Sequence, residues 1–480
     1  MTAPTDFDAL FRPRAVAVVG ASATTVSGGN RFLRHLKNFG YQGPIWPIHP
    51  KAAEIEGFKA YASFQALPEQ VDYAFVAVNA QQVPEVIRSA RGKAKFIQVM
   101  SSGFSETDSG KALEKELVKA AIDADVRVIG PNCLGTYSPS GGLTFTAGAA
   151  KEVGSIGIVS QSGGLGVDIL RRGKNKGLLF GGLVTVGNCA DVKPAEILEY
   201  YFTSNQFHTI GVYLETAMGG RRLFEILRKY RGVKPVVLLK GGSTAAGQMA
   251  AISHTGALAG SQAAWQALET QTNLISTATL DEFLDVLLTL QCVGAAQQLA
   301  DGVVLFGNGG GTSVLGADAF SRHGLRLANL SQHSAHALDA LNLPAGSSVA
   351  NPIDVPAGAL QQDSGNIAGK ILSALTLTPG AMIVIHINMT VVTSFSHVDM
   401  LGNLIDAVMK LRTDAWSAAL LVLVLRSDGD TEMEQIKRKY RQLAIAAGIP
   451  VFNELSEAAV AIGAIRRSRF GSVAKSGSLS

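Results

Sequence analysis

Residues 155–166 read SIGIVSQSGGLG, an apolar run that passes directly into serines and glycines. A short apolar run closed by turn residues predicts a buried strand. The serines and glycines after it predict the turn that opens a helix. A strand that leads through such a loop into a helix begins a βαβ unit. This stretch therefore predicts an α/β fold built on a parallel sheet.

The same pattern opens two other parts of the chain, AVAVVG (15–20) and GVVLFGNGGG (302–311). Further apolar, β-rich runs follow each of the three starts, with helical patterns between most of them. These runs are IWPIHP, VDYAFVAV, FIQVM and VRVIG in the first part, GGLVTVG, TIGVYLE and PVVLLKG in the second, and AMIVIHI, AALLVLVLR and PVFN in the third. We predict three α/β units in series, with a flexible tail. Their ranges are 1–149, 150–297 and 298–471, and the tail is 472–480.

The composition limits the class of protein. Of 480 residues, 47% are apolar and 17% charged, which suits packed globular domains. The net charge is +4 without a dense Lys/Arg block, so nucleic acid is not expected as a partner. No apolar stretch reaches the roughly 18 residues of a membrane span, so no membrane association is expected. Three cysteines are too few for a disulfide framework, and we expect a reducing cytoplasm.

The three glycine-containing loops predict ligand sites. In open parallel sheets ligands bind at the carboxyl ends of strands, where a helix N-terminus attracts anions. The loop VVGASATTVSGGN (18–30) lacks the G-x-G-x-x-G fingerprint of nicotinamide dinucleotide sites and the acidic residue about 20 positions on, so another phosphate-bearing ligand is favoured. In the second loop, IVSQSGGLG (158–166), the two serines and the glycines Gly163 and Gly164 favour the binding of an anion. A tight turn without ligand remains the alternative for any single loop, including FGNGGGTS (306–313).

His254 lies in GGSTAAGQMAAISHTGALAGS (241–261), which has no strand alternation and little helical periodicity. We predict a functional loop there, because long loops of small residues commonly serve function. Metal binding would need further ligands at local spacing, and none is present. A nucleophilic histidine needs a carboxylate to orient it. Glu215 closes an apolar strand where a charge is unexpected, although a solvent-facing strand end is the alternative. Since parallel strand ends converge, Glu215 could meet the loop after the next strand.

The motif SHTGALAGS (253–261) resembles the nucleoside-diphosphate-forming acyl-CoA synthetases, a family that includes the α subunits of ADP-forming acetyl-CoA synthetases and is related to the succinyl-CoA synthetase α subunits. The motifs VVGAS (18–22), GPNCLG (130–135), IVSQSGGLG (158–166) and NPIDV (351–355) agree with it in order and spacing. The resemblance covers about residues 8–470. It implies a Rossmann-like CoA-binding domain followed by two flavodoxin-like ligase domains.

The resemblance also implies residue roles. His254 would be phosphorylated during turnover, and Glu215 would steady it. The phosphate would be held by Ser160, Ser162, Gly163 and Gly164. CoA would contact Gly20, Ala21, Ser22, Lys51, Val78, Asn79, Ser102, Gly103 and Asn132. Three positions depart from the family pattern: His49 stands where Asn is common, Asn79 where Pro is usual, and Cys189 where a charged residue is common. We interpret Cys189 as a small buried residue, with a role in acyl-substrate choice as the alternative.

The family binds its nucleotide on an ATP-grasp domain. The 480 residues leave no room for one, and no G-x-x-x-x-G-K-[ST] pattern appears. We therefore expect ATP/ADP and Mg²⁺ to bind a separate ATP-grasp β subunit, in a hetero-oligomer that acts on a small carboxylic acid. The alternatives are a regulatory CoA-binding protein that lacks catalysis and a nicotinamide oxidoreductase, which the missing fingerprint disfavours. The CoA-binding half of a lysine acetyltransferase is set aside, because no acetyltransferase domain is fused to the chain.

Overall fold

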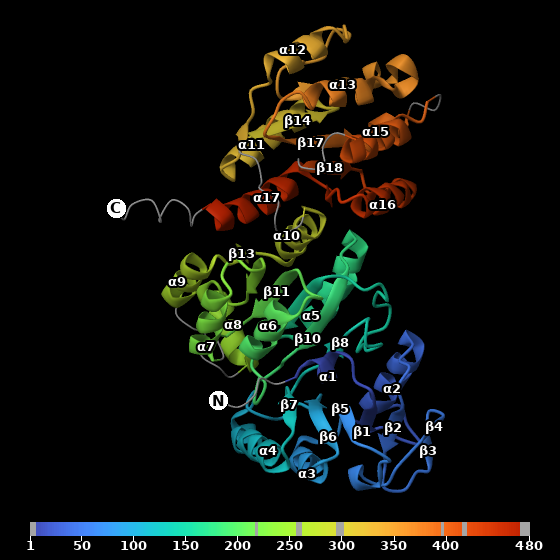
Figure 1. Ribbon diagram of the computed structural model, residues 1–480, viewed down its shortest axis with the longest axis vertical. Coiled ribbons are helices and arrows are strands. Elements are labelled where there is room, and N and C mark those ends of the chain that lie inside the picture. The colour runs from blue at the N-terminus through green and yellow to red at the C-terminus, as the bar shows by residue number, and fades with distance from the viewer. Residues whose placement is uncertain are drawn as a thin grey trace. The chain divides into compact units, whose positions relative to one another are not determined.

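The computed structural model describes residues 6–216, 219–255, 262–293, 302–394, 398–414 and 420–470. The chain forms two compact units, Met1–Leu280 and Asp281–Ser480. Figure 1 shows two layered sheets in the first unit and one in the second. The two units are described separately below.

The first sheet has the order β2-β1-β5-β6-β7 and is parallel throughout. Its strands are β1 (Val16–Val19), β2 (Ile45–Ile48), β5 (Val71–Val76), β6 (Ala94–Val99) and β7 (Arg127–Ile129), and β3 (Glu54–Ile55) and β4 (Phe58–Lys59) form a separate hairpin. Its helices are α1 (Asp8–Phe11), α2 (Gly28–Phe39), α3 (Val83–Ser89) and α4 (Lys111–Ala124), with 3₁₀ turns at Phe64–Ala66, Ala80–Gln82 and Asp108–Gly110. Helices α3 and α4 pack against each other on one side of the sheet (Figure 1). Strands of this sheet are buried on both faces, as covered parallel sheets require.

The second sheet has the order β13-β12-β11-β9-β10-β8. Its strands are β8 (Thr136–Tyr137), β9 (Ile156–Ser160), β10 (Phe180–Thr185), β11 (Thr209–Leu214), β12 (Val236–Lys240) and β13 (Ile275–Thr277). Its helices are α5 (Gly163–Lys176), α6 (Pro194–Thr203), α7 (Gly220–Lys229), α8 (Ala245–Thr255) and α9 (Gln262–Thr272). All neighbours are parallel except β8, which runs antiparallel to β10. Strand β8 precedes residue 150 in the sequence but completes the sheet that follows it.

The first two sheets share one hydrophobic core, and α1 lies within it. The Phe11 ring stacks on Tyr200 of α6 with centroids 5.2 Å apart, and it also contacts Tyr201 and Phe207. Phe11 itself is fully buried. Burial of such large rings is a main source of stability, so α1 helps to fix the two sheets as one unit.

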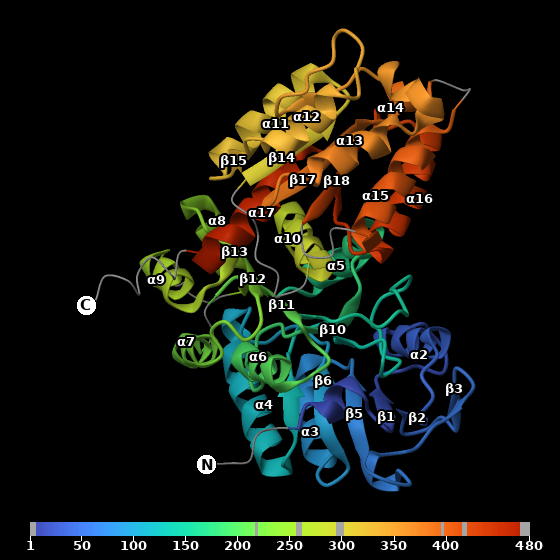
Figure 2. The same cartoon turned by 45° about the horizontal axis from the view of Figure 1, so that its top comes forward.

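The sheet of the second unit has the order β15-β14-β17-β18-β19, with β16 paired to β14. Its strands are β14 (Gly302–Gly307), β15 (Arg326–Leu327), β16 (Ile353–Asp354), β17 (Ala381–Asn388), β18 (Leu421–Arg426) and β19 (Val451–Phe452). Its helices are α10 (Leu280–Val293), α11 (Gly310–Arg322), α12 (Gln332–Asp339), α13 (Ile367–Leu375), α14 (Met389–Thr393), α15 (Met400–Asp414), α16 (Thr431–Ala446) and α17 (Leu455–Phe470), with a 3₁₀ helix at Ala359–Gly365. Figure 2 shows α13 between α12 and α15, while α11 packs on α17.

The predicted α/β class with parallel sheets is confirmed, and every apolar run named above contains an observed strand. The strands that the sequence pattern missed are two or three residues long, too short for periodicity to reveal. The boundaries near 150 and 298 stay predictions, as does the flexible tail 472–480, which lies outside the described residues.

Candidate functional site

Each of the three sheets reverses its strand order at one point, between β1 and β5, between β9 and β11, and between β14 and β17. Ligands of open α/β sheets bind outside the carboxyl ends of the strands at such a point. The three glycine-containing loops follow β1, β9 and β14, so each stands at the position where this architecture binds ligands.

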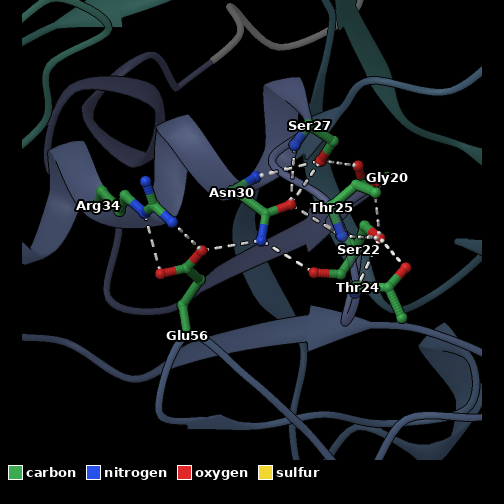
Figure 3. Close-up of polar contacts among 8 residues, drawn as sticks. All are labelled: Gly20, Ser22, Thr24, Thr25, Ser27, Asn30, Arg34 and Glu56. Carbon is green, nitrogen blue, oxygen red and sulfur yellow. Dashed lines mark hydrogen bonds and ion pairs between the residues drawn. The ribbon is translucent and has the colours of Figure 1, made fainter.

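The loop after β1 approaches the neighbouring strand closely. Gly20 has φ +93°, and a Cβ atom there would lie 2.2 Å from the Ala77 carbonyl oxygen, so no larger residue fits. The Ser22 amide donates to Asn30 Oδ1 at 2.8 Å, and the Ser22 hydroxyl oxygen accepts from the amides of Thr24 and Thr25 at 3.2 Å each (Figure 3). The polar atoms of Ser22 therefore shape the loop. Ala21 beside it is buried.

The other predicted CoA residues follow β5, β6 and β7 at the same edge of the first sheet. The Ser101 hydroxyl donates to the Val78 carbonyl, and the Ser101 carbonyl accepts from the Asn132 amide at 3.0 Å. Asn79 and Ser102 are exposed. The structure therefore brings these positions to one edge of the sheet, where an extended ligand could contact all of them.

Lys51 follows β2, which pairs with β1, and it is exposed at this edge as well. His49 Nδ1 accepts from the Lys51 amide at 3.1 Å and from the Ala52 amide at 2.9 Å. An Asn side-chain oxygen plays the same acceptor role in turns. The His49 departure from the family pattern thus keeps a turn-forming acceptor at that position.

The loop after β9 leads into the N-terminus of α5. The hydroxyl of Ser160, which is fully buried, donates to the Ser162 carbonyl at 2.7 Å, and Ser162 caps the helix by accepting from the Leu165 amide at 3.3 Å. Gly163 and Gly164 form the first turn, whose amides have no partner within the helix. A Cβ atom on Gly164 would meet no atom within 4 Å. This helix start therefore offers amides, a positive dipole end and space to an anion.

Glu215 follows β11 and is buried rather than solvent-facing. Its Oε1 accepts from the Tyr213 hydroxyl at 3.1 Å. Burial is the larger cause that raises the pKa of Tyr213, and the negative charge of Glu215 raises it further. Gln161, in the loop after β9, accepts from the Glu215 amide at 2.9 Å and donates to Thr216 Oγ1 at 3.0 Å. Gln161 thus joins Glu215 to the predicted phosphate loop. Nothing in the sequence pattern singled out Gln161.

Glu215 also lies against the segment that follows the next strand. The Gly241 amide donates to the Leu214 carbonyl at 2.9 Å, and a Cβ atom on Gly241 would lie 3.1 Å from Glu215 Cγ. Strands β11 and β12 are parallel neighbours, so their carboxyl ends lie at the same edge of the sheet, as the sequence predicted.

The loop predicted around His254 is wrong over Ala245–Thr255, because this segment is helix α8. Its alanines have the highest helix propensity, and this outweighs the missing amphipathic pattern. The backbone of His254 lies in the last turn of α8. Its side chain and residues 256–261 lie outside the described part of the chain, so the pairing with Glu215 stays a prediction.

The third loop precedes α11 and has a buried histidine beneath it. His386 Nε2 lies 3.0 Å from Ser313 Oγ, and burial together with nearby Arg426 lowers the pKa of His386 to about 4. Arg426 Nη1 donates to Thr312 Oγ1 at 2.7 Å. This helix start therefore has a cation beside it and a neutral histidine below.

Asn188, in the loop after β10 of the second sheet, contacts residues near the predicted CoA site. Its Nδ2 donates to Glu106 Oε2 at 2.7 Å and to Glu114 Oε2 at 2.9 Å, while the other oxygen of Glu106 accepts from the Gly103 amide. The next residue, Cys189, is fully buried, and burial raises the pKa of its thiol to about 12. A thiol of that kind stays protonated, which supports its interpretation as a small buried residue.

In the described ranges of the chain, no group of three or more His, Cys, Asp or Glu side chains could hold a metal ion. None of the described helices is long and apolar enough to cross a membrane.

Comparison with known proteins matches residues 14–139 to a CoA binding domain and residues 153–290 to the succinyl-CoA ligase like flavodoxin domain. The chain is 34% identical to the acetate–CoA ligase [ADP-forming] II subunit alpha of Pyrococcus furiosus, over 76% of this chain and 79% of the relative. It is 36% identical to the acetate–CoA ligase [ADP-forming] I of Archaeoglobus fulgidus, over 72% of this chain and 50% of that longer protein.

A solved structure matches the whole chain. The acetyl-coenzyme A synthetase 1 of Candidatus Korarchaeum cryptofilum, in complex with phosphate and ADP, superposes with a TM-score of 0.84 at 26% identity, over 99% of each chain. The resemblance inferred from the motifs is therefore confirmed, and with it the CoA-binding and ligase folds. This chain belongs to the family of the ADP-forming acetate–CoA ligase α subunits.

Proposed function

We propose that the protein is the α subunit of an ADP-forming acyl-CoA synthetase. It would convert a small carboxylic acid, CoA and ATP into acyl-CoA, ADP and phosphate, reversibly. One observation carries the proposal. The buried carboxylate Glu215, the amides at the start of α5 and the segment that leads to His254 meet at the carboxyl ends of β9 and β11, where the strand order reverses.

The proposed chemistry divides among these groups. His254 takes the γ-phosphoryl group of ATP and releases ADP, and Glu215 orients its ring and balances its charge. The phosphoryl group then passes to the carboxylate of the acid, and the CoA thiol displaces phosphate from the resulting acyl phosphate. The phosphoryl group on His254 would be an anion at the carboxyl end of α8, which is the negative end of that helix dipole. The amides of Gly163 and Gly164, with Ser160 and Ser162 behind them, compensate for this.

The residues at the edge of the first sheet fit CoA. Gly20 has a positive φ and packs against the Ala77 backbone, so the loop follows a course that a residue with a side chain could not take. Exposed Lys51 at the same edge can meet a phosphate. The remaining candidate contacts, Ala21, Ser22, Val78, Asn79, Ser102, Gly103 and Asn132, stay part of this proposal.

We assign ATP and Mg²⁺ to an ATP-grasp β subunit on a separate chain. The support is that a relative covered over most of its length is named a subunit alpha, whereas this chain covers half of a relative whose name has no subunit. The α and β chains would form a hetero-oligomer. Cys133, Cys189 and Cys292 are not joined in disulfides, and this supports our expectation of a reducing cytoplasm.

The test is phosphoryl transfer from γ-labelled ATP in the presence of the β subunit. Wild-type protein should acquire label that is labile in acid and stable in base. His254→Ala should acquire none. Glu215→Gln should acquire label at least about tenfold more slowly, because an amide cannot balance the imidazolium charge.

The control is His333→Ala, which alters an exposed histidine of α12 and should label like wild type. Label retained in His254→Ala would contradict the histidine assignment. CoA binding without any labelling of wild type would favour the regulatory alternative.

A further inference from the structure

Asn30 is a buried polar residue that neither the motifs nor the comparisons single out. It lies in the first turn of α2, with 3% of its surface exposed. Its Oδ1 accepts from the amides of Ser22 and Ser27 at 2.8 and 3.2 Å, and the Ser27 hydroxyl lies 2.7 Å away (Figure 3). One side chain thus holds both ends of the loop between β1 and α2.

The other half of the Asn30 amide faces two acceptors. Its Nδ2 donates to the Ser22 carbonyl and to Glu56 Oε1, each at 2.9 Å. A carbonyl and a carboxylate can only accept here, so Nδ2 must point to them and Oδ1 to the loop amides. Glu56 therefore fixes which way the amide faces.

Glu56 comes from a different element, the turn between β3 and β4, where its φ is +53°. Arg34 of α2 holds its carboxylate in a two-point contact, Nε to Oε2 at 3.0 Å and Nη2 to Oε1 at 2.9 Å. This contact lowers the pKa of Glu56 and keeps it ionised as an acceptor. A chain of contacts therefore runs from Arg34 through Glu56 and Asn30 to the loop.

We propose that Asn30 is a positioning residue for CoA and that Glu56 orients its amide, so that the pair sets the affinity of the loop at residues 20–27 without touching the ligand. The proposal rests on the proposed function, which assigns CoA to this loop. Ser22 then has a framework role beside its place among the candidate CoA contacts, because its amide donates to Asn30 and its hydroxyl oxygen accepts from the Thr24 and Thr25 amides.

Asn30→Asp tests the proposal with a change of almost no volume. It replaces the donor with an oxygen that faces Glu56 Oε1 and the Ser22 carbonyl, so three acceptors meet where a donor stood. Glu56→Gln in the same chain supplies an amide donor from the other side. That amide nitrogen no longer accepts from Arg34 Nη2, so the double variant should restore the contact in part. Glu54→Gln, an exposed position on the same hairpin, is the matched control.

The measurements are kcat, the KM for CoA and the KM for the acid, with the β subunit present, together with calorimetric CoA binding and amide hydrogen exchange. Asn30→Asp should raise the KM for CoA about tenfold or more, which corresponds to about 1.4 kcal/mol, and leave the KM for the acid within about twofold. The amides of Ser22 and Ser27 should exchange faster without ligand. The double variant should recover part of both effects, while the control Glu54→Gln stays within about threefold of wild type.

The outcomes separate the two proposals. If wild type fails to bind CoA, the proposed function fails, while exchange at Ser22 and Ser27 still tests the hold of Asn30 on the loop. If wild type binds CoA and Asn30→Asp binds it equally, the inference is overturned. A folded double variant without recovery overturns the role of Glu56. If Asn30→Asp lowers the melting temperature and raises both KM values alike, Asn30 is structural only and the inference is overturned.

Discussion

At the scale of single residues, two glycines with a positive φ differ in how much space surrounds them. Gly20 has a positive φ and no room for a Cβ atom. Gly40, at the carboxyl end of α2, has φ +99° but no atom within 4 Å of a Cβ position. Both glycines have a positive φ that would strain a residue with a side chain. Only at Gly20 would that side chain also clash with a neighbour, Ala77.

Gly20→Ala should therefore cost more than about 2 kcal/mol of unfolding free energy and abolish CoA binding, because both strain and clash act. Gly40→Ala should cost about 1 kcal/mol from strain alone and leave CoA binding unchanged. Chemical denaturation and calorimetry with CoA compare the two. Equal losses of stability in both variants would show that the approach to Ala77 does not constrain the loop.

His386 should make the stability of the unit Asp281–Ser480 depend on pH. Its pKa in the folded protein, about 4, lies below its ordinary value of 6.5, so the unfolded chain binds the proton more readily. The stabilisation is complete above about pH 6.5 and is lost as the pH falls toward 4. From pH 7.5 to 5 the loss should be about 2 kcal/mol.

Thermal unfolding of wild type and His386→Asn at the two pH values measures this. The variant should lose less stability on acidification than wild type. His333→Asn, at an exposed position of α12, should follow wild type. A His386→Asn profile parallel to that of wild type would show that another group causes the acid sensitivity.

At the scale of elements, helix N-termini provide both stability and the proposed anion site. Ser162 caps α5 and Ser331 caps α12 in the same way, each accepting from the amide three residues on. Only α5 starts beside the buried Glu215, through Gln161. The two caps therefore separate capping from phosphate binding.

Ser162→Ala and Ser331→Ala should each cost about 1 kcal/mol of stability, the usual value of a lost cap. Only Ser162→Ala should slow the phosphorylation of His254, by about fivefold, because it also disturbs the amides at the start of α5. Denaturation curves and labelling with γ-labelled ATP measure the two effects. Equal labelling in both variants would contradict a phosphate site at this helix.

At the scale of the whole molecule, the first two sheets are joined by polar contacts as well as by the shared core. Arg127 of β7 contacts Asp191 and Glu196 near the start of α6, with N–O distances of 3.0 Å to each. The Arg127 side chain is 30% exposed, so these charge-assisted bonds are largely shielded from water. Arg88, in contrast, is more exposed and pairs with Glu85 and Glu116 on the surface.

Arg127→Met should lower the unfolding free energy of Met1–Leu280 by about 1–3 kcal/mol, because two carboxylates lose their donor. Arg88→Met should change it by less than about 1 kcal/mol, as is usual for surface ion pairs. Denaturant unfolding of the full chain compares them. If the two variants lose the same stability, the contact between the sheets is no stronger than a surface pair.

Much of the site could be predicted from local sequence because its loops are local. Strands of four or more residues, the glycine turns after them and the family motif SHTGALAGS are all short-range patterns. Helix α8 was missed because alanine propensity, and not amphipathicity, makes it helical. Asn30 could have been found from the capping-box spacing after Ser27, whereas Gln161 left no signal.

The α/β class, the three strand-to-glycine loops and the family can be predicted from local patterns, because periodicity and turn chemistry act over a few neighbouring residues. Which residues meet depends on the folded chain: Gln161 contacts Glu215, Glu56 contacts Asn30, and Asn188 contacts Glu106. Such contacts join residues 26 to 82 positions apart. They depend on strand order and on the packing of side chains against partners distant in the chain, which no local pattern encodes.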